Sequence, residues 1–285
     1  MNEKGGSFRK FRWALIIIFL ISVVLMGAYT QIPGLNTMDP MIFNAVGSIL
    51  VTLLMLLIVA LHGTERYGKK NMLIFFMITA GVAYLFENIN VATGWPAGSY
   101  SYTSNLGFLP VPFVIVFNYF TMGYLSWMTS QILTANYAEK LKGKQIFILP
   151  LVAAFIMVMW DLGMDPINST ILDLYIWDVP GPYFGVPIMN FVAWFVVVFI
   201  FFQLFALYIS KYDNINSEKV SKISNKPYWS EAPVTYGIMG LYNILFVISF
   251  RNDLTISMAL ITVFTMGFVV ILALVNIWNN PDLRS

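Results

Sequence analysis

Eight apolar stretches dominate the chain, and each approaches the length that a helix needs to cross a membrane. Spanning roughly 30 Å of hydrocarbon takes about 20 mostly apolar residues. The stretches are Trp13–Thr30, Ile42–Leu61, Met72–Phe86, Pro110–Leu133, Ile146–Met164, Val186–Tyr208, Val234–Phe250 and Leu254–Ile277. Because lipid offers no hydrogen bonds to the backbone, such segments cross as helices. The sequence therefore predicts an all-α fold, a polytopic membrane helix bundle with about eight transmembrane helices in a single integral membrane domain of residues 1–285.

The composition agrees with a membrane protein and excludes several kinds of site. Hydrophobic residues make up 59% of the 285 residues and charged residues only 11%, whereas a soluble domain has roughly 25% charged residues. The absence of cysteine excludes disulfides, thiolate nucleophiles and cysteine-ligated zinc, and the single histidine, His62, excludes a multi-histidine metal site. We expect no metal, no cofactor and no nucleic-acid partner. The oligomeric state stays open.

Lysine and arginine fall on alternate connections between the apolar stretches. They cluster in the N-terminal segment, in every second loop and at the C-terminus, so all but one of the 16 lie on one side of the predicted bundle. By the positive-inside rule that side is the cytoplasm. We therefore predict a multi-pass protein of the cell membrane with both termini cytoplasmic. On the same side, we interpret Ile209–Pro233 as a solvated loop and His62 as an interface residue.

Two long segments on the opposite, outer side carry acidic residues without any lysine or arginine. Two long outer segments, Glu87–Leu109 and Asp165–Gly185, and the adjoining helix ends contain Glu87, Asp161 and Asp165. A carboxyl group at the edge of hydrocarbon costs several kcal/mol, so it usually marks a functional site or a buried partner. Asp161 and Asp165 are four residues apart and share one helical face. We take these three as candidate catalytic residues, although Asp165 could instead cap a helix end before Pro166.

Aromatic residues crowd the same outer segments. Tryptophan and tyrosine collect at membrane interfaces as a belt, which is the simplest interpretation of any single one. Together with the acidic residues, however, they could also line a binding site for a lipid-soluble polyene. The aromatic candidates for this role are Trp95, Tyr100, Tyr102, Trp177, Tyr183 and Phe184.

This combination of residues suits acid catalysis on an alkene. Closely spaced carboxyl groups away from water can differ in protonation, so one can act as a general acid while another stays ionised. Aromatic faces stabilise a cation, which is what protonating an alkene produces. Capture of that cation by water gives hydration, and capture by a neighbouring double bond gives cyclisation. The sequence contains no phosphate-binding glycine loop, no nucleophile elbow and no zinc-protease helix motif.

Two ordered blocks of residues resemble the carotenoid biosynthesis protein family, which includes the CruF-type hydratases. The first block is Glu87–Tyr102, followed by Leu106-Gly107 and Val111-Pro112. The second is Asp161–Pro166, Trp177, Gly181–Pro187, Asn190 and Trp194. The resemblance implies a cofactor-free membrane enzyme that adds water across the terminal double bond of an acyclic carotenoid end group. It also adds Asn190 and Trp194 to the candidate substrate-binding residues.

Two other functions remain open from the sequence. A membrane carotenoid cyclase would share the proton donor but exclude water, so its product would keep the mass of the substrate. A transporter or receptor with a polar cavity would change no pigment. The leading hypothesis is a carotenoid hydratase in which Asp161 or Glu87 donates the proton, the other or Asp165 activates water, and the aromatic residues line a polyene tunnel.

Overall fold

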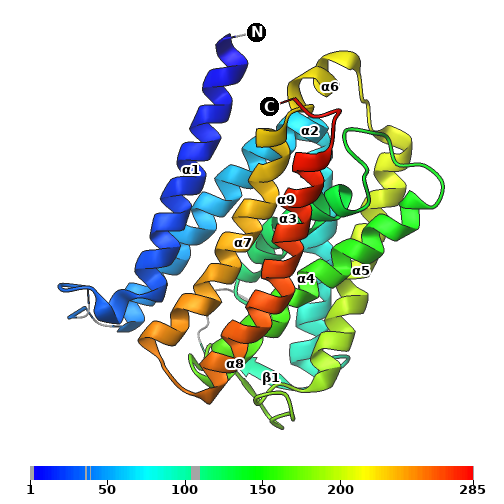
Figure 1. Ribbon diagram of the computed structural model, residues 1–285. Helices are drawn as coiled ribbons and strands as arrows, with labels where there is room; N and C mark the ends of the chain where they lie inside the picture. The colour runs from blue at the N-terminus through cyan, green and yellow to red at the C-terminus, as the bar shows by residue number, and fades with distance from the viewer. Residues whose placement is uncertain (1–2, 36, 39, 104–109, 285) are drawn as a thin grey trace.

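The computed structural model describes residues 3–35, 37–38, 40–103 and 110–284, so Leu106-Gly107 of the first motif block lies outside it. Figure 1 shows long helices packed side by side, with both termini and α6 at one end and β1 at the other. In chain order the elements are α1 (Glu3–Gly27), the 3₁₀ turn η1 (Tyr29–Gln31), α2 (Pro40–Thr93), β1 (Tyr100–Tyr102), α3 (Val114–Leu133), α4 (Gln145–Thr170), β2 (Tyr175–Trp177), α5 (Ile188–Tyr212), α6 (Ser217–Ile223), α7 (Lys226–Ser249), α8 (Asp253–Thr262), the π-helical turn η2 (Val263–Gly267) and α9 (Phe268–Asn279).

Six helices among the described residues are long and apolar enough to cross a membrane, which confirms the predicted all-α membrane bundle. The 20-residue α3 is not one of them. It packs against α2, α4, α7 and α9, and every residue from Phe120 to Ile132 is buried. A helix enclosed by other helices shows little surface to lipid, so polar residues such as Thr129 and Gln131 are tolerated there. The predicted number of eight crossings stays a prediction.

α2 is a helical hairpin rather than one straight helix. Its 54 residues would extend about 80 Å if straight, far more than a bilayer core. Gly68 interrupts it with φ 81° and ψ 162°, a conformation that residues with a Cβ atom avoid. Figure 1 shows both ends of α2 at the lower end of the view and the bend at the upper end. The predicted stretches Ile42–Leu61 and Met72–Phe86 are the two arms of this hairpin.

α4 continues past the point at which the sequence suggested that it ends. Pro166 lies inside it, and the helix reaches Thr170. A proline deprives the carbonyl four residues earlier of its helical hydrogen bond. Here the carbonyl of Leu162 accepts the hydroxyl of Tyr183 instead, at 3.0 Å. Asp165 is therefore a residue within α4, and the expected loop Asp165–Gly185 begins later than predicted.

The interpretation of Ile209–Pro233 as a solvated loop is wrong. α5 extends to Tyr212, α6 follows, and α7 already begins at Lys226 instead of at the predicted Val234. Glu231 in this stretch is 0% exposed and pairs with Arg12 of α1 at 2.5 Å. A charged residue can be buried when a partner neutralises it, and this partner is 219 positions away in the sequence. Local polarity could not reveal that contact.

A two-stranded antiparallel sheet joins the two outer segments. β1 pairs with β2 so that Tyr100 lies opposite Trp177 and Tyr102 opposite Tyr175. The sheet covers the bundle at the end opposite both termini (Figure 1). The two motif blocks, separated in sequence by all of α3 and most of α4, therefore meet here.

The common position of the termini and α6 agrees with the alternation of basic residues, and the side of the membrane that they face can be tested. The chain has no native cysteine, and Ser217 and Ser99 are both exposed at opposite ends of the bundle. We expect an impermeant thiol reagent added to intact cells to label Ser99→Cys and to spare Ser217→Cys until the cells are lysed. Labelling of Ser217→Cys but not of Ser99→Cys in intact cells would show that the orientation is opposite to the predicted one.

Candidate active site

The turn after α2 returns the chain onto the helix that it has just left. Asn90 is fully buried and holds this turn, because its amide nitrogen donates to the carbonyl of Gly98 and its Oδ1 accepts the N–H of Ala97, both at 2.7 Å. Gly98 has φ 116°, and a Cβ atom there would lie 3.4 Å from the ring of Trp177. β1 therefore starts beside the end of α2, which brings Tyr100 back to Glu87.

Glu87 is buried and surrounded by tyrosine hydroxyl groups. Its Oε2 accepts hydrogen bonds from Tyr100 and, at 3.3 Å, from Tyr102, both on β1. Its Oε1 accepts from Tyr119 of α3 at 3.4 Å. With three donors directed at its two oxygens, Glu87 is arranged as a hydrogen-bond acceptor.

Asp165 is also buried and also has a donor at each oxygen. Tyr175 of β2 donates its hydroxyl to Oδ1 at 2.5 Å, and the amide of Asn190 at the start of α5 donates to Oδ2. Asn190 is itself 1% exposed, so this amide donor is held inside the protein. Asp165 thus resembles Glu87 in being arranged to accept hydrogen bonds on both oxygens.

Asp161 differs from both. Its Oδ2 is buried and has no hydrogen-bond partner among the described residues. It borders a cavity of about 10 Å³, which Tyr119, Trp160 and Trp194 also line. A space of roughly this size accommodates one water molecule. Asp161 therefore has a carboxyl oxygen without a hydrogen-bond partner among the described residues, and the residue lines a cavity large enough for one water molecule.

The three carboxyl groups form one site. Asp161 lies one helical turn before Asp165 on α4 and close enough to Glu87 for the charges of all three to interact. Tyr119 links them, because its hydroxyl donates to Glu87 and the residue also lines the cavity beside Asp161. The described residues contain no group of three or more histidine, aspartate or glutamate side chains arranged to hold a metal ion.

The match to known proteins covers both acidic segments. The model of the carotenoid biosynthesis protein family matches residues 47–274, well over half of the chain. The chain belongs to this family. A curated relative is bisanhydrobacterioruberin hydratase from Haloarcula japonica, which is 27% identical over 183 residues, covering 62% of this chain and 60% of the relative. The chain thus spans less than two thirds of the length of that relative. No solved structure matches this chain.

Several of the aromatic candidates lie around the three carboxyl groups of this chain. Tyr100 contacts the buried ring of Trp177 at a centroid distance of 4.7 Å, and Tyr102 contacts Tyr175 at 5.8 Å. Trp194 packs on Tyr119 at 5.1 Å and borders the Asp161 cavity. Because these rings fill the space, the cavity is much smaller than a polyene tunnel. Entry of a polyene end group would require the aromatic side chains to move apart.

The remaining aromatic candidates lie at the edge of the site or outside it. Tyr183 is half-buried, with its hydroxyl on the carbonyl of Leu162 and its ring against Phe191. Phe184 is exposed, and its ring packs against Tyr183. Trp95 is 62% exposed and packs on Phe86. We therefore do not place Trp95 or Phe184 among the residues that contact the carboxyl groups.

The tyrosines of the sheet are held in their neutral, donating form. Burial and the nearby Glu87 charge raise the pKa of Tyr100 and Tyr102 well above the ordinary value, and burial and Asp165 do the same for the pKa of Tyr175. At the edge, burial and the charges of Asp165 and Asp161 raise the pKa of Tyr183 to about 12. A neutral phenol remains a hydrogen-bond donor to its carboxylate across the physiological pH range.

Sequence reasoning missed three residues that shape this site. Tyr119 lies inside the predicted apolar stretch Pro110–Leu133, and the sequence patterns single out neither Tyr175 nor Asn90. A sequence signal for Tyr119 does exist, because the polar pair Asn118-Tyr119 interrupts a stretch otherwise suited to lipid. Nothing local distinguishes Tyr175 from a belt residue, because its partner Asp165 is known only from the fold.

A second polar network lies at the opposite end of the bundle. Arg12 forms ion pairs with Glu231 and Glu65, and Arg66 pairs with Asp213 at 2.9 Å. His62, expected at the interface, is instead 1% exposed within α2. It contacts the hydroxyl of Tyr124 at 2.6 Å and the carbonyl of Tyr228 at 3.0 Å. The correction follows from α2 continuing to its bend at Gly68 rather than ending near Leu61.

Proposed function

We propose that the protein is a carotenoid hydratase that adds water across the terminal double bond of an acyclic carotenoid end group. The observation that carries this proposal is the contrast among the three carboxyl groups. Glu87 and Asp165 have both oxygens engaged by donors, whereas Asp161 has an oxygen without a donor and lines a cavity the size of one water molecule. Family membership and the name of the Haloarcula japonica relative, bisanhydrobacterioruberin hydratase, support a carotenoid as substrate.

The proposed reaction needs only a proton, a water molecule and a base. Asp161 transfers its proton to the less substituted carbon of the terminal double bond, and the π electrons form the new C–H bond. The other carbon becomes a tertiary cation. Water attacks it through oxygen and releases one proton to a carboxylate of the site. The product carries one added hydrogen and one hydroxyl group, and the carboxyl groups together hold as many protons as before.

Each carboxyl group then has a distinct role. Asp161 is the general acid, because no donor occupies its Oδ2 and the residue lines the cavity. Asp165 accepts the proton from the attacking water, since it lies one helical turn away and its orientation is held by Tyr175 and Asn190. Glu87 supplies negative charge near the developing cation and holds Tyr119 in place. The faces of Tyr119 and Trp194 stabilise that cation.

The product made in a carotenoid-producing host tests the proposal. We expect expression of this protein in cells that accumulate an acyclic carotenoid to yield a more polar pigment whose mass is greater by one water per modified end group. The measurement is liquid chromatography with mass detection, with empty vector as control. A pigment of altered retention and unchanged mass would identify a cyclase, and unchanged pigment with correctly inserted protein would contradict a carotenoid-modifying role.

A further inference from the structure

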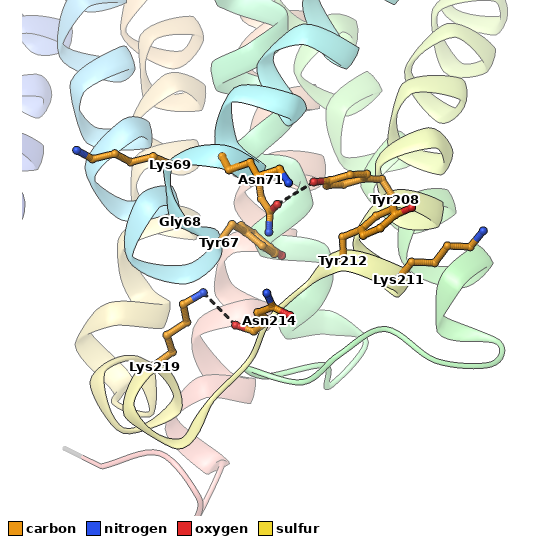
Figure 2. Close-up of a pocket in the computed structure, with 10 residues that line it drawn as sticks. Tyr67, Gly68, Lys69, Asn71, Tyr208, Lys211, Tyr212, Asn214 and Lys219 are labelled. Atoms are coloured by element: carbon orange, nitrogen blue, oxygen red, sulfur yellow. Dashed lines mark hydrogen bonds between the residues drawn. The ribbon is translucent and has the colours of Figure 1, made fainter.

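A second cavity lies at the opposite end of the bundle from the carboxyl groups. It has a volume of about 340 Å³ and is lined at the bend of α2, at the end of α5 and in the segment leading to α6. Four of the residues that line it are lysines: Lys69, Lys70, Lys211 and Lys219. No acidic residue borders it among the described residues. We call it the basic pocket (Figure 2).

The backbone of α2 opens onto the basic pocket at its bend. Gly68 ends one helical arm, and Lys69 begins the next. A Cβ atom on Gly68 would meet nothing within 4 Å, so open space adjoins the Cα atom at the bend. The start of a helix is the positive end of its dipole, which favours an anion. The backbone and the lysines therefore contribute charge of the same sign.

Asn71 adds a hydrogen-bond donor that lacks an acceptor. It lines the basic pocket and is only 7% exposed. Its Oδ1 accepts the hydroxyl of Tyr208 at 3.1 Å, while its amide nitrogen has no hydrogen bond within the described part of the chain. Figure 2 shows that nitrogen turned away from Tyr208. This nitrogen keeps access to the pocket, where its N–H groups can donate to a ligand or to solvent.

The acidic residue nearest in sequence to Lys211, Asp213, does not neutralise the positive charge of the pocket lysines. Asp213 lies between Lys211 and Asn214 but is buried and paired with Arg66. In Figure 2, Lys219 points toward the pocket, with its Nζ on the carbonyl of Asn214 at 3.0 Å, whereas Lys69 and Lys211 extend away on opposite sides. Both of these are exposed and have flexible stems that can turn toward an anion.

We propose that the basic pocket binds a phosphate group. Compact basic pockets between membrane helices suit the headgroup of an anionic phospholipid, and a free phosphate ion presents the same chemistry. The side chains of Leu73 and Leu207 lie within one helical turn of Lys70 and Tyr208 and are 62% and 49% exposed. Acyl chains attached to a phosphate in the pocket would meet that apolar surface. The proposal is independent of the reaction assigned to the carboxyl site.

The test compares two double variants of equal charge. Lys69→Gln with Lys211→Gln removes two lysines of the pocket, and Lys142→Gln with Lys144→Gln removes two exposed lysines at the same end of the bundle that do not line it. The full-length protein in neutral detergent is titrated calorimetrically at low salt with dihexanoyl phosphatidylglycerol, dihexanoyl phosphatidylcholine and inorganic phosphate. Equal thermal unfolding midpoints of both variants without ligand establish that both are folded.

We expect phosphatidylglycerol to bind the unaltered protein, and the pocket variant to bind it about 25-fold more weakly, since each lysine near an anionic lipid contributes roughly fivefold in Kd. The Lys142/Lys144 variant should bind as the unaltered protein does. Stronger binding of phosphatidylglycerol than of inorganic phosphate identifies a lipid as the source, and equal binding identifies the free ion. Equal losses in both variants, or equal binding of phosphatidylcholine, would overturn the proposal.

Discussion

Replacing Asp161 with asparagine is expected to lower the yield of hydrated carotenoid by about 10²–10⁴-fold, the range that general acid catalysis contributes. Asparagine keeps the shape of the side chain but has no acidic proton to transfer. Because Oδ2 of Asp161 has no hydrogen-bond partner among the described residues, the change disrupts no such contact there. Activity should therefore fall far more than stability.

Variants at other carboxyl groups show whether the loss of activity is specific to Asp161 and its site or follows from removing any outer carboxyl group. Glu87→Gln should also lose most activity, since it removes the charge that Tyr100, Tyr102 and Tyr119 surround. Asp173→Asn and Asp178→Asn are the controls, because both side chains are exposed in the outer segment and should leave activity within a few-fold. The measurement is hydrated product per unit of correctly inserted protein, with thermal unfolding in detergent for each variant. Near-normal turnover in both Asp161→Asn and Glu87→Gln would refute the carboxylic-acid mechanism.

Replacing Arg12 with methionine is expected to destabilise the protein by about 3–5 kcal/mol, the usual cost of removing one member of a buried ion pair. Arg12 is 1% exposed and donates from Nε to Glu231 at 2.5 Å, and Glu231 is fully enclosed. Without the guanidinium group, Glu231 keeps a buried carboxylate with no ion-pair partner among the described residues. The contact joins α1 to α7, so its loss also weakens the docking of the first helix.

Two further variants show whether the charge or the packing is responsible. Lys10→Met removes a cation from the exposed side of the same helix and should change stability by less than about 1 kcal/mol. Arg12→Met with Glu231→Met replaces the pair by apolar side chains, and should recover much of the lost stability because no buried charge remains. The midpoint of unfolding in detergent is compared for all three. A double variant no more stable than Arg12→Met would mean that Arg12 acts through packing or through Glu65.

The sequence alone determined the helical membrane class and the segments that carry the acidic residues. Both depend on local properties: a stretch of about 20 apolar residues prefers hydrocarbon whatever lies elsewhere in the chain, and a carboxyl group at its edge is costly wherever it occurs. Glu87, Asp161 and Asp165 were therefore visible as candidates before any fold was known. Their catalytic roles remain predictions.

Only the tertiary structure decided which partners these residues meet. Glu87 accepts hydrogen bonds from tyrosine hydroxyl groups of β1 and α3. Asp165 accepts hydrogen bonds from Tyr175 and from Asn190, which is 25 residues away in the sequence. Glu231 was read as solvated because its neutralising partner lies 219 positions away. Pro166 did not end α4, because Tyr183 supplies a hydrogen bond to the carbonyl that the proline leaves free. Hydropathy is summed over neighbours in sequence, whereas hydrogen bonds and ion pairs form between neighbours in space, and the packing of the bundle alone defines those.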